Sequence, residues 1–269
     1  LEDAIPSDQK NVARSIVNKA SKKIAKEDDI DVYVRLNPFT DETGLVVPCG
    51  EEDLREVVSE NIKGIMIPKI ENAKDIVMVH RILIELEKSI GLMVGQVHLV
   101  GIVETVLGVE NVFSISSVEI GDRNLTLAFG AGDYTNDLNI EWPKDEFNLD
   151  YPRTRIASAC RVSNLSKPID TVWIDLDDEH GLRESCKRAK NLGFFGKLCI
   201  HPKQVEIVNQ VFTPSRVEYE RAVKIKQVFD EAKKKGEGST SVNGKMIDAP
   251  IVFAADKVIA LKDVFGVRE

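Results

Sequence analysis

The sequence predicts an α/β protein of the TIM (β/α)8 barrel class, followed by a helical arm at its C-terminal end. Three observations support this fold class. Apolar runs of strand length alternate with segments of helical periodicity along most of the chain. The 269 residues match the typical length of such a barrel, about 250 residues. No glycine-rich phosphate loop follows the first strand, as the competing doubly wound sheet would require.

Six apolar runs have the length and composition of strands that are buried on both faces of a parallel sheet. Segments with apolar residues at helical spacing lie between them, such as 7–25 and 72–91. This alternation is typical of consecutive parallel βαβ units. The predicted strands are residues 31–37, 62–69, 97–104, 125–131, 170–175 and 196–202.

The opening residues, "LEDAIPSDQK", resemble the end of a further apolar strand at Leu1. A strand at Leu1 and a strand–helix unit before it would raise the number of strands to eight, the number in a closed barrel. We therefore expect an N-terminal strand–helix unit to be missing from this sequence.

The pattern changes after the last predicted strand. Residues 217–235 form a long amphipathic helix, 236–245 a polar flexible linker, and 246–265 a second helix with Asp248 near its beginning. We predict a barrel over residues 1–235 and an arm or lid over residues 236–269, because an arm on a mobile linker is able to close over an active site.

The composition is that of a globular protein, with 43% hydrophobic and 30% charged residues and a net charge of −8. There is no basic run with interleaved aromatic residues, so we expect no nucleic-acid partner. No apolar run approaches the roughly 18–20 residues that cross a bilayer, so we expect no membrane span. The four cysteines are scattered, which is typical of reduced thiols in the cytoplasm.

Polar residues stand at the ends of the predicted strands, where barrel enzymes place their chemistry. Glu104 ends "LVGIVE", and Asp133 follows "LAFGAG" on the next strand. Two carboxylates without histidine or cysteine favour a hard ion, Mg²⁺ or Mn²⁺, over zinc. The glycines of "GAG" would let a substrate approach the backbone closely. A carboxylate that only caps the following helix is the alternative for each acid taken alone.

Two cations follow neighbouring strands. Arg35 is placed to hold a substrate carboxylate or a developing oxyanion. Lys69 follows "IMIP" and has three alternatives: it binds a phosphate or carboxylate, pairs with an acid such as Glu71, or forms a Schiff base. Glu2 and Asp3 end the incomplete first strand at the same mouth.

Several motifs, in order along nearly the whole chain, resemble the citrate lyase β-subunit and malyl-CoA/citramalyl-CoA lyase family of the HpcH/HpaI aldolase and citrate lyase superfamily. They include "LEDAIPSDQKNVAR", "VRLNP", "IMIPKIEN", "VETVLGVENV", "LAFGAGDYTNDL", "GFFGKLCIHPKQ" followed by "FTPS", and "GKMIDAP". The resemblance is specific for the family and much less so for the substrate. The family's basic, phosphate-contacting segment before "LED" is not in this sequence.

The resemblance implies a Mg²⁺-dependent enzyme that breaks or forms a C–C bond between an acyl-CoA enolate and a keto acid. It implies a homotrimer or a dimer of trimers. Glu104 and Asp133 match the metal-binding carboxylates, and Arg35 matches the arginine that binds substrate oxygens. Asp248 matches the arm aspartate that acts as acid and base, usually in an adjacent subunit. Glu2 and Asp3 match a pair near the metal's waters, and the backbone of Gly132 and Asp133 lies where the keto-acid carboxylate is held.

Four functions remain open from the sequence. The first is a stand-alone lyase for malyl-CoA, citramalyl-CoA or citryl-CoA. The second is a β-subunit of citrate lyase, which acts on a carrier-protein thioester with partner subunits. The third is a non-catalytic binding protein, against which Arg35, Glu104, Asp133 and Asp248 argue together. The fourth is a metal-dependent aldolase for free hydroxy-keto acids, which would not need the "MIDAP" arm.

Overall fold

The structure, a computed structural model, describes all residues except 3, 28–29, 41–44, 243 and 268–269. The chain forms two compact units. The first comprises Leu1–Trp173 and Arg188–Leu198, and the second comprises Ile174–Lys187 and Cys199–Glu269. The predicted strand-end residues Arg35, Lys69, Glu104 and Asp133 belong to the first unit, and Asp248 belongs to the second.

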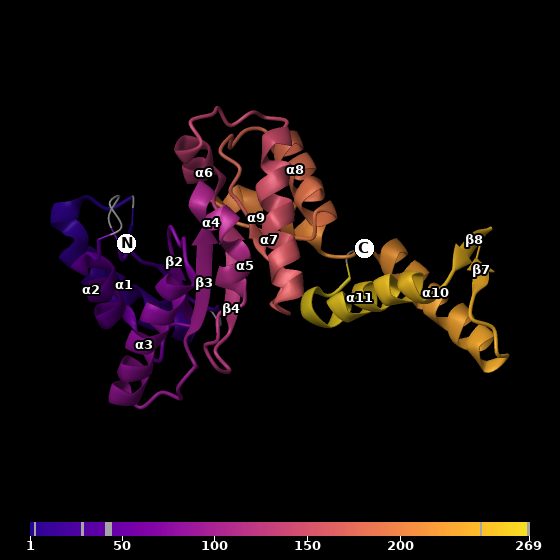
Figure 1. Cartoon of the computed structure of the whole chain (residues 1–269), viewed down its shortest axis with the longest axis horizontal. Coiled ribbons are helices and arrows are strands. Elements are labelled where there is room, and N and C mark those ends of the chain that lie inside the picture. The colour runs from indigo at the N-terminus through magenta and orange to yellow at the C-terminus, as the bar shows by residue number, and fades with distance from the viewer. Residues whose placement is uncertain (3, 28–29, 41–44, 243, 268–269) are drawn as a thin grey trace. The chain divides into compact units, whose positions relative to one another are not determined.

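Six parallel strands form the sheet of the first unit, and strands adjacent in the sheet are consecutive in the chain (Figure 1). Five of them lie within predicted apolar runs, and β5 (Ile169–Asp170) overlaps its predicted run, 170–175, at Asp170 alone. A doubly wound sheet would reverse its strand order at a switch point, so the sequential order confirms the barrel-type α/β class. The strands are β1 (Tyr33–Arg35), β2 (Gly64–Ile67), β3 (His98–Val103), β4 (Leu125–Phe129), β5 (Ile169–Asp170) and β6 (Gly196–Lys197).

Helices precede and separate these strands, and α3, α4 and α5 lie beside β2–β4 (Figure 1). The ends of α3 follow from its sequence: Asn72 and Asp75 form a capping box, and Gly91 ends the helix with φ of 78°. The helices are η1 (Ser7–Gln9), α1 (Lys10–Glu27), α2 (Pro48–Val57), α3 (Ala73–Ile90), α4 (Val106–Glu110), α5 (Val112–Ser116), α6 (Ala131–Asp137), η2 (Phe147–Leu149), α7 (Asp150–Val162) and α8 (Glu179–Asn191).

Alternate residues of the strands lie on the same face of the six-stranded sheet. Val100, Ile102 and Ala128 form an apolar cluster there, and Met66 and Ile169 pack against it. Glu104 lies two residues after Ile102, so its side chain is on the same face of the sheet. The register pairs Val103 with Phe129, so Gly130 is the neighbour of Glu104 on β4.

Two predicted strands are shorter than expected at their C-terminal ends. β5 ends at Asp170 rather than at residue 175, and β6 ends at Lys197 rather than at residue 202. Trp173 is buried, but Ile174 is 62% exposed, so the apolar run 172–174 does not continue as a sheet strand. His201 instead caps α9 (Pro202–Phe212), accepting a hydrogen bond from the Lys203 amide.

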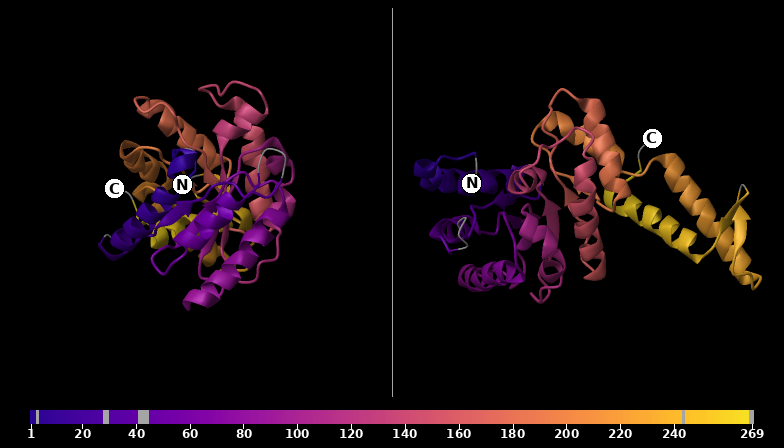
Figure 2. Two further views of the ribbon diagram at one scale, coloured as in Figure 1. Left: turned by 90° about the vertical axis from the view of Figure 1, so that its left-hand side faces the viewer. Right: turned by 45° about the horizontal axis from the view of Figure 1, so that its top comes forward.

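The second unit contains α10 (Arg216–Lys234) and α11 (Ala249–Phe265), which pack side by side (Figure 2). The prediction of a flexible linker over 236–245 was wrong from residue 240 on. An antiparallel hairpin joins the helices, with β7 (Thr240–Val242) paired to β8 (Lys245–Ile247). The Asn-Gly dipeptide at 243–244 is the sequence feature that favours this hairpin, because it is typical of a two-residue turn. Gly244 has φ of 74°. Residue 243 lies outside the described residues. Helix α11 therefore begins at residue 249 rather than 246.

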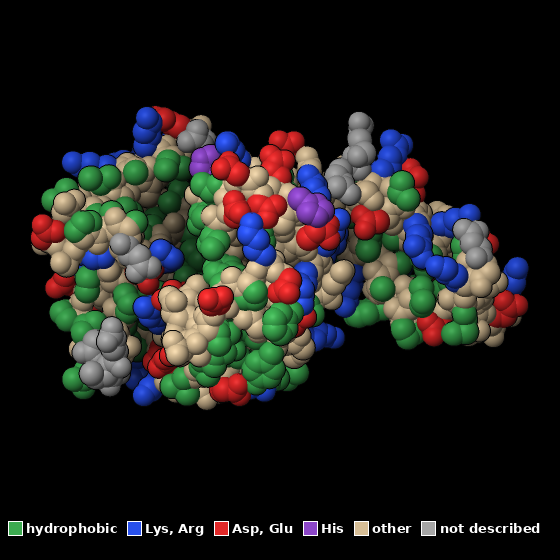
Figure 3. Space-filling model, turned by 90° about the horizontal axis from the view of Figure 1, so that it is seen from above, with side chains coloured by type: hydrophobic (Ala, Val, Ile, Leu, Met, Phe, Trp, Pro, Cys, Tyr) green, Lys and Arg blue, Asp and Glu red, His purple; other side chains and the backbone are tan. Residues whose placement is uncertain are grey.

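The division into a barrel over 1–235 and an arm over 236–269 stays a prediction. None of the helices in the described part of the chain combines the length and the apolarity that a membrane span needs. Acidic and basic side chains are interspersed over the face shown in Figure 3.

A buried ionic cluster links β5, β6 and α7 in the first unit. Arg153 donates hydrogen bonds from Nε and Nη2 to the two carboxylate oxygens of Asp170, at 2.8 and 3.0 Å, and Lys197 donates from Nζ at 2.7 Å. All three side chains are fully buried. Burial alone would raise the pKa of Asp170, but Lys197 and Arg153 outweigh it and lower that pKa.

We expect Asp170→Asn to lower the free energy of unfolding by about 3–5 kcal/mol, because buried Lys197 and Arg153 both lose the charge of Asp170. Arg153 keeps its second buried ion pair, with Glu146 at 3.0 Å. Urea unfolding measures the change. Asp150→Asn is the matched control: Asp150 pairs with Arg188 at 2.6 Å, but both side chains are partly exposed, so the loss should stay below about 1 kcal/mol. Equal losses in the two variants would contradict the role of burial.

Candidate active site

Glu104 is the most buried of the predicted site residues, with 4% exposure at the end of β3. Its Oε1 accepts a hydrogen bond from the backbone N–H of Lys69 at 2.8 Å. Gly130 faces its side chain: a methyl group at residue 130 would lie 2.6 Å from the Glu104 Cβ and would also meet Oε2. The glycine therefore makes room for Glu104, which is a different reason from the substrate approach predicted for the "GAG" motif.

Lys69 connects Glu104 with Asp133. Its backbone adopts the left-handed region, with φ of 50°, which costs energy for a residue with a side chain. In this conformation the backbone amide of Lys69 donates a hydrogen bond to Glu104. The side-chain ammonium of Lys69 lies 3.4 Å from Asp133 Oδ1. Among the described residues, Lys69 forms its ion pair with Asp133 and not with the alternative partner, Glu71. The backbone amide of Glu71 donates to the capping carboxylate of Asp75.

Arg35 is held by Glu2, with 2.8 Å between Arg35 Nε and Glu2 Oε2. The backbone nitrogen of Leu1 also donates to the Arg35 carbonyl at 3.0 Å, which places residues 1–2 beside the edge of β1. Lys10 donates to the backbone oxygens of Leu1 and Glu2 and to Asn37 Oδ1. The predicted partner of Glu2, Asp3, lies outside the described residues.

The electrostatics identify a site with an excess of negative charge. The pKa of Glu104 is raised to about 8, first by burial and further by Asp133 and Glu2, which outweigh the Lys69 amide bond and the Lys69 charge. Three acids therefore lie close enough to repel one another. A bound cation would relieve this repulsion.

The residues present fit a hard divalent ion. Mg²⁺ typically takes one or two protein carboxylates and keeps its other positions for water and substrate. Glu104 and Asp133 supply that number of carboxylates. Among the described residues, no group of three or more His, Cys, Asp or Glu side chains is arranged to hold a metal, so a site with a full set of protein ligands, such as structural zinc, is not present there.

Asp133 is positioned by a buried hydrogen bond that sequence reasoning missed. The Ala131 amide, at the first position of α6, donates to Thr171 Oγ1 at 2.9 Å. Two residues on, Asp133 lies in the first turn of the helix. Among the described residues, the amides of Gly132 and Asp133 have no protein acceptor. The register between β4 and β5 places Thr171 here. Ala128 pairs with Ile169, so Gly130 and Thr171, each two residues further along, are also neighbours.

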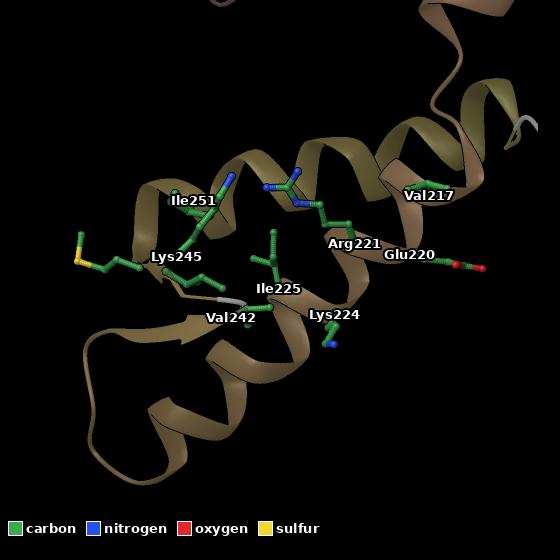
Figure 4. Close-up of a pocket in the computed structure, with 10 residues that line it drawn as sticks. Val217, Glu220, Arg221, Lys224, Ile225, Val242, Lys245 and Ile251 are labelled. Atoms are coloured by element: carbon green, nitrogen blue, oxygen red, sulfur yellow. The ribbon is translucent and has the colours of Figure 1, made fainter.

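Asp248 caps α11 in the second unit, accepting from the Ile251 amide at 3.4 Å. The same unit contains a cavity of about 530 Å³ between α10, the hairpin and α11 (Figure 4). Arg221 and Lys245 point toward the same space in Figure 4, over an apolar lining that includes Ile225 and Val242. None of the predicted site residues lines this cavity, so the strand ends, not this cavity, are the candidate active site.

Parallel strands in sequential order, with acids and cations at their C-terminal ends, define a protein of the barrel-type α/β class. The sequence profile of the HpcH/HpaI aldolase/citrate lyase family matches residues 1–202. The chain belongs to this family and is a lyase.

Three similar proteins illustrate the range of the family. The chain is 34% identical to "Citrate lyase subunit beta" of Leuconostoc mesenteroides subsp. cremoris, over 97% of this chain and 83% of that protein. It is 29% identical to "(3S)-malyl-CoA thioesterase" of Cereibacter sphaeroides, over 97% and 84%. The structure of protein CitE from Mycobacterium tuberculosis, in complex with magnesium, acetoacetate and coenzyme A, shares the fold with a TM-score of 0.72 and 21% identity, over 98% of this chain and 88% of that chain.

We expect Gly130→Ala to weaken Mg²⁺ binding and activity at least about tenfold, because an added methyl group displaces the Glu104 carboxylate, and small misplacements in a site are costly. Titration calorimetry measures the first effect. Gly196→Ala is the control, since a methyl group there meets nothing within 4 Å. Unchanged Mg²⁺ binding in folded Gly130→Ala would show that Glu104 does not need this space.

The raised pKa of Glu104 predicts that the metal-free protein loses stability as the pH rises. The unfolded chain releases this proton near the ordinary value of 4.5 and the folded chain near 8. Between these values the folded state binds more protons, so the free energy of unfolding falls by up to about 1.4 kcal/mol per pH unit. Thermal unfolding in EDTA should show a steeper loss in the wild type than in Glu104→Gln. The same pH dependence in the wild type and in Glu104→Gln would contradict the raised pKa of Glu104.

Proposed function

We propose that the protein is a Mg²⁺-dependent C–C lyase, or Claisen-type condensing enzyme, for a 3-hydroxyacyl-CoA thioester of the malyl-CoA, citramalyl-CoA or citryl-CoA type. Its products would be an acyl-CoA and a keto acid. The observation that carries the proposal is the buried Glu104, grouped with Asp133 and two cations at the strand ends. The names of the relatives, a citrate lyase subunit and a malyl-CoA thioesterase, fit the same thioester chemistry.

Glu104 and Asp133 would hold the ion, Mg²⁺ or alternatively Mn²⁺. When bound, such an ion polarises a substrate carbonyl and lowers the pKa of a substrate hydroxyl. The amides of Gly132 and Asp133 would hold the carboxylate of the small acid, since they have no protein acceptor among the described residues. Glu2 would keep the Arg35 guanidinium in place from the neighbouring strand edge.

Arg35 and Asp248 would carry out the remaining steps. In the lyase direction the hydroxyl proton leaves to a base, and the C–C bond breaks. Its electron pair enters the thioester as an enolate, whose oxygen Arg35 stabilises. Asp248 then donates a proton to the enolate carbon, and in the condensing direction it removes that proton. Closure of the arm would exclude water and protect the thioester from hydrolysis.

The proposal includes a cytoplasmic homotrimer or hexamer, in which Asp248 would reach the site of an adjacent subunit. The second candidate is a citrate lyase β-subunit that cleaves a citryl thioester on a carrier protein within a multi-subunit complex. The 34% identity to a citrate lyase subunit β favours this candidate. The Asp248 arm favours the stand-alone lyase.

The test is thioester cleavage on a panel of citramalyl-CoA, malyl-CoA and citryl-CoA, with Mg²⁺ and with EDTA, using protein expressed from the complete gene. Mg²⁺-dependent release of a keto acid from one substrate supports the lyase and names the acyl group. Inactivity on all three, with co-purification of an acyl-carrier subunit and cleavage of its citryl thioester, would favour the citrate lyase subunit. No cleavage of any thioester would contradict both.

We expect Asp248→Asn to reduce turnover by at least about a hundredfold while Mg²⁺ and keto-acid binding stay within twofold, because a general acid contributes about 10²–10⁴ to the rate. Asp256→Asn is the control on the same helix: Asp256 pairs with Lys226 at 2.6 Å and should leave turnover unchanged. Glu104→Ala should instead lose Mg²⁺ binding in calorimetry. Loss of keto-acid binding in Asp248→Asn would argue against its role in proton transfer.

A further inference from the structure

Each cation at the strand ends is held by an acid of the same site. Arg35 pairs with Glu2 at 2.8 Å, and the Lys69 ammonium lies 3.4 Å from Asp133 Oδ1. Within the described part of the chain, the hydrogen bond that the Glu104 carboxylate accepts comes from the Lys69 backbone amide, not from a charged side chain. Lys69 is therefore the side chain that balances the charge of the proposed ion-binding acids in the ligand-free protein.

The backbone of Lys69 is fixed, but its ammonium is free to change partners. The amide bond to Glu104, the left-handed conformation and the burial of Ile70, at 1% exposure, hold the main chain in place. The side chain is 43% exposed, and its partner Asp133 is 42% exposed. A lysine side chain has four rotatable bonds, so the ammonium is able to move several ångströms without any change in the backbone.

We propose that Lys69 is an exchangeable counter-ion that makes cation binding precede binding of the small acid. The ammonium neutralises Asp133 in the ligand-free protein and competes with a divalent cation for it. Once Asp133 is shared with a divalent cation, the ammonium is repelled and becomes the partner of the incoming substrate carboxylate. This inference rests on the proposed function and deepens it, because it assigns Lys69 to substrate recognition and sets the order of binding.

The proposal requires that one substitution shift two affinities in opposite directions. Lys69→Met retains the apolar stem and the amide bond to Glu104 but removes the charge. We expect it to bind Mg²⁺ about tenfold more tightly, since a competing charge a few ångströms away is lost. In the presence of saturating Mg²⁺ we expect it to bind pyruvate about tenfold more weakly, since the substrate carboxylate loses an ion pair. Titration calorimetry measures both constants without turnover.

Two controls separate this role from others. Lys74→Met removes the same charge from an exposed position on α3 and should leave both affinities within twofold of the wild type. Lys69→Arg keeps the charge and should bind Mg²⁺ like the wild type. Thermal unfolding verifies that each variant is folded.

The outcomes are distinct. Tighter Mg²⁺ binding together with weaker pyruvate binding in Lys69→Met supports the exchange. Weakening of both affinities would show a structural role for Lys69, and no change in either would show that Lys69 is not the counter-ion, so each result overturns the inference. A wild-type protein that binds neither Mg²⁺ nor pyruvate would instead overturn the proposed function.

Discussion

The burial of Glu104 opposite Gly130 is the constraint on which the candidate site depends. The parallel register of β3 and β4 brings these two residues side by side, and only a residue without a side chain leaves the space that the carboxylate fills. The Lys69 amide then fixes one carboxylate oxygen from β2. Three strands thus define the orientation of one side chain, and the helix that follows Gly130 carries Asp133 toward the same point.

This arrangement is unfavourable for the ligand-free fold. A carboxylate whose pKa is raised to about 8 destabilises the folded chain when it is ionised, and the left-handed conformation of Lys69 adds strain. Elsewhere in the same unit a buried charge is fully compensated: Asp170 has two buried cations and a lowered pKa. The contrast between the two buried acids supports the proposal that the partner of Glu104 is a ligand rather than another side chain.

Much of the fold and the main acids of the site were predictable, because they depend on local patterns. Near-continuous apolar runs separated by helical segments determine a parallel sheet, and period-two alternation carries Glu104 to the interior face after Ile102. The role of Gly130, the left-handed Lys69 and the Thr171 bond depend on register between strands far apart in the sequence, which no local pattern contains. The hairpin over 240–247 had a local signal in its Asn-Gly dipeptide, but the polar composition of the segment favoured a linker. Asp170, the last residue of β5, has buried ion pairs with Arg153 and Lys197, which only the packing of α7 and β6 reveals.

The site divides its charges between fixed and adjustable groups. Glu104 is fixed by a short side chain, by burial and by a backbone hydrogen bond, whereas Arg35 and Lys69 reach the site on long side chains that are 44% and 43% exposed. Oxygen ligands of a hard divalent ion must be positioned accurately, which suits acids at the ends of strands. Cations that meet a substrate must follow a charge that moves from a carboxylate or hydroxyl to an enolate, which suits flexible stems. The two cations differ in the acid that holds each one. The Lys69 ammonium lies beside Asp133, a proposed ligand of the ion, so binding of the ion would release it. The Arg35 guanidinium pairs with Glu2, which is not a proposed ligand of the ion and would keep it in place.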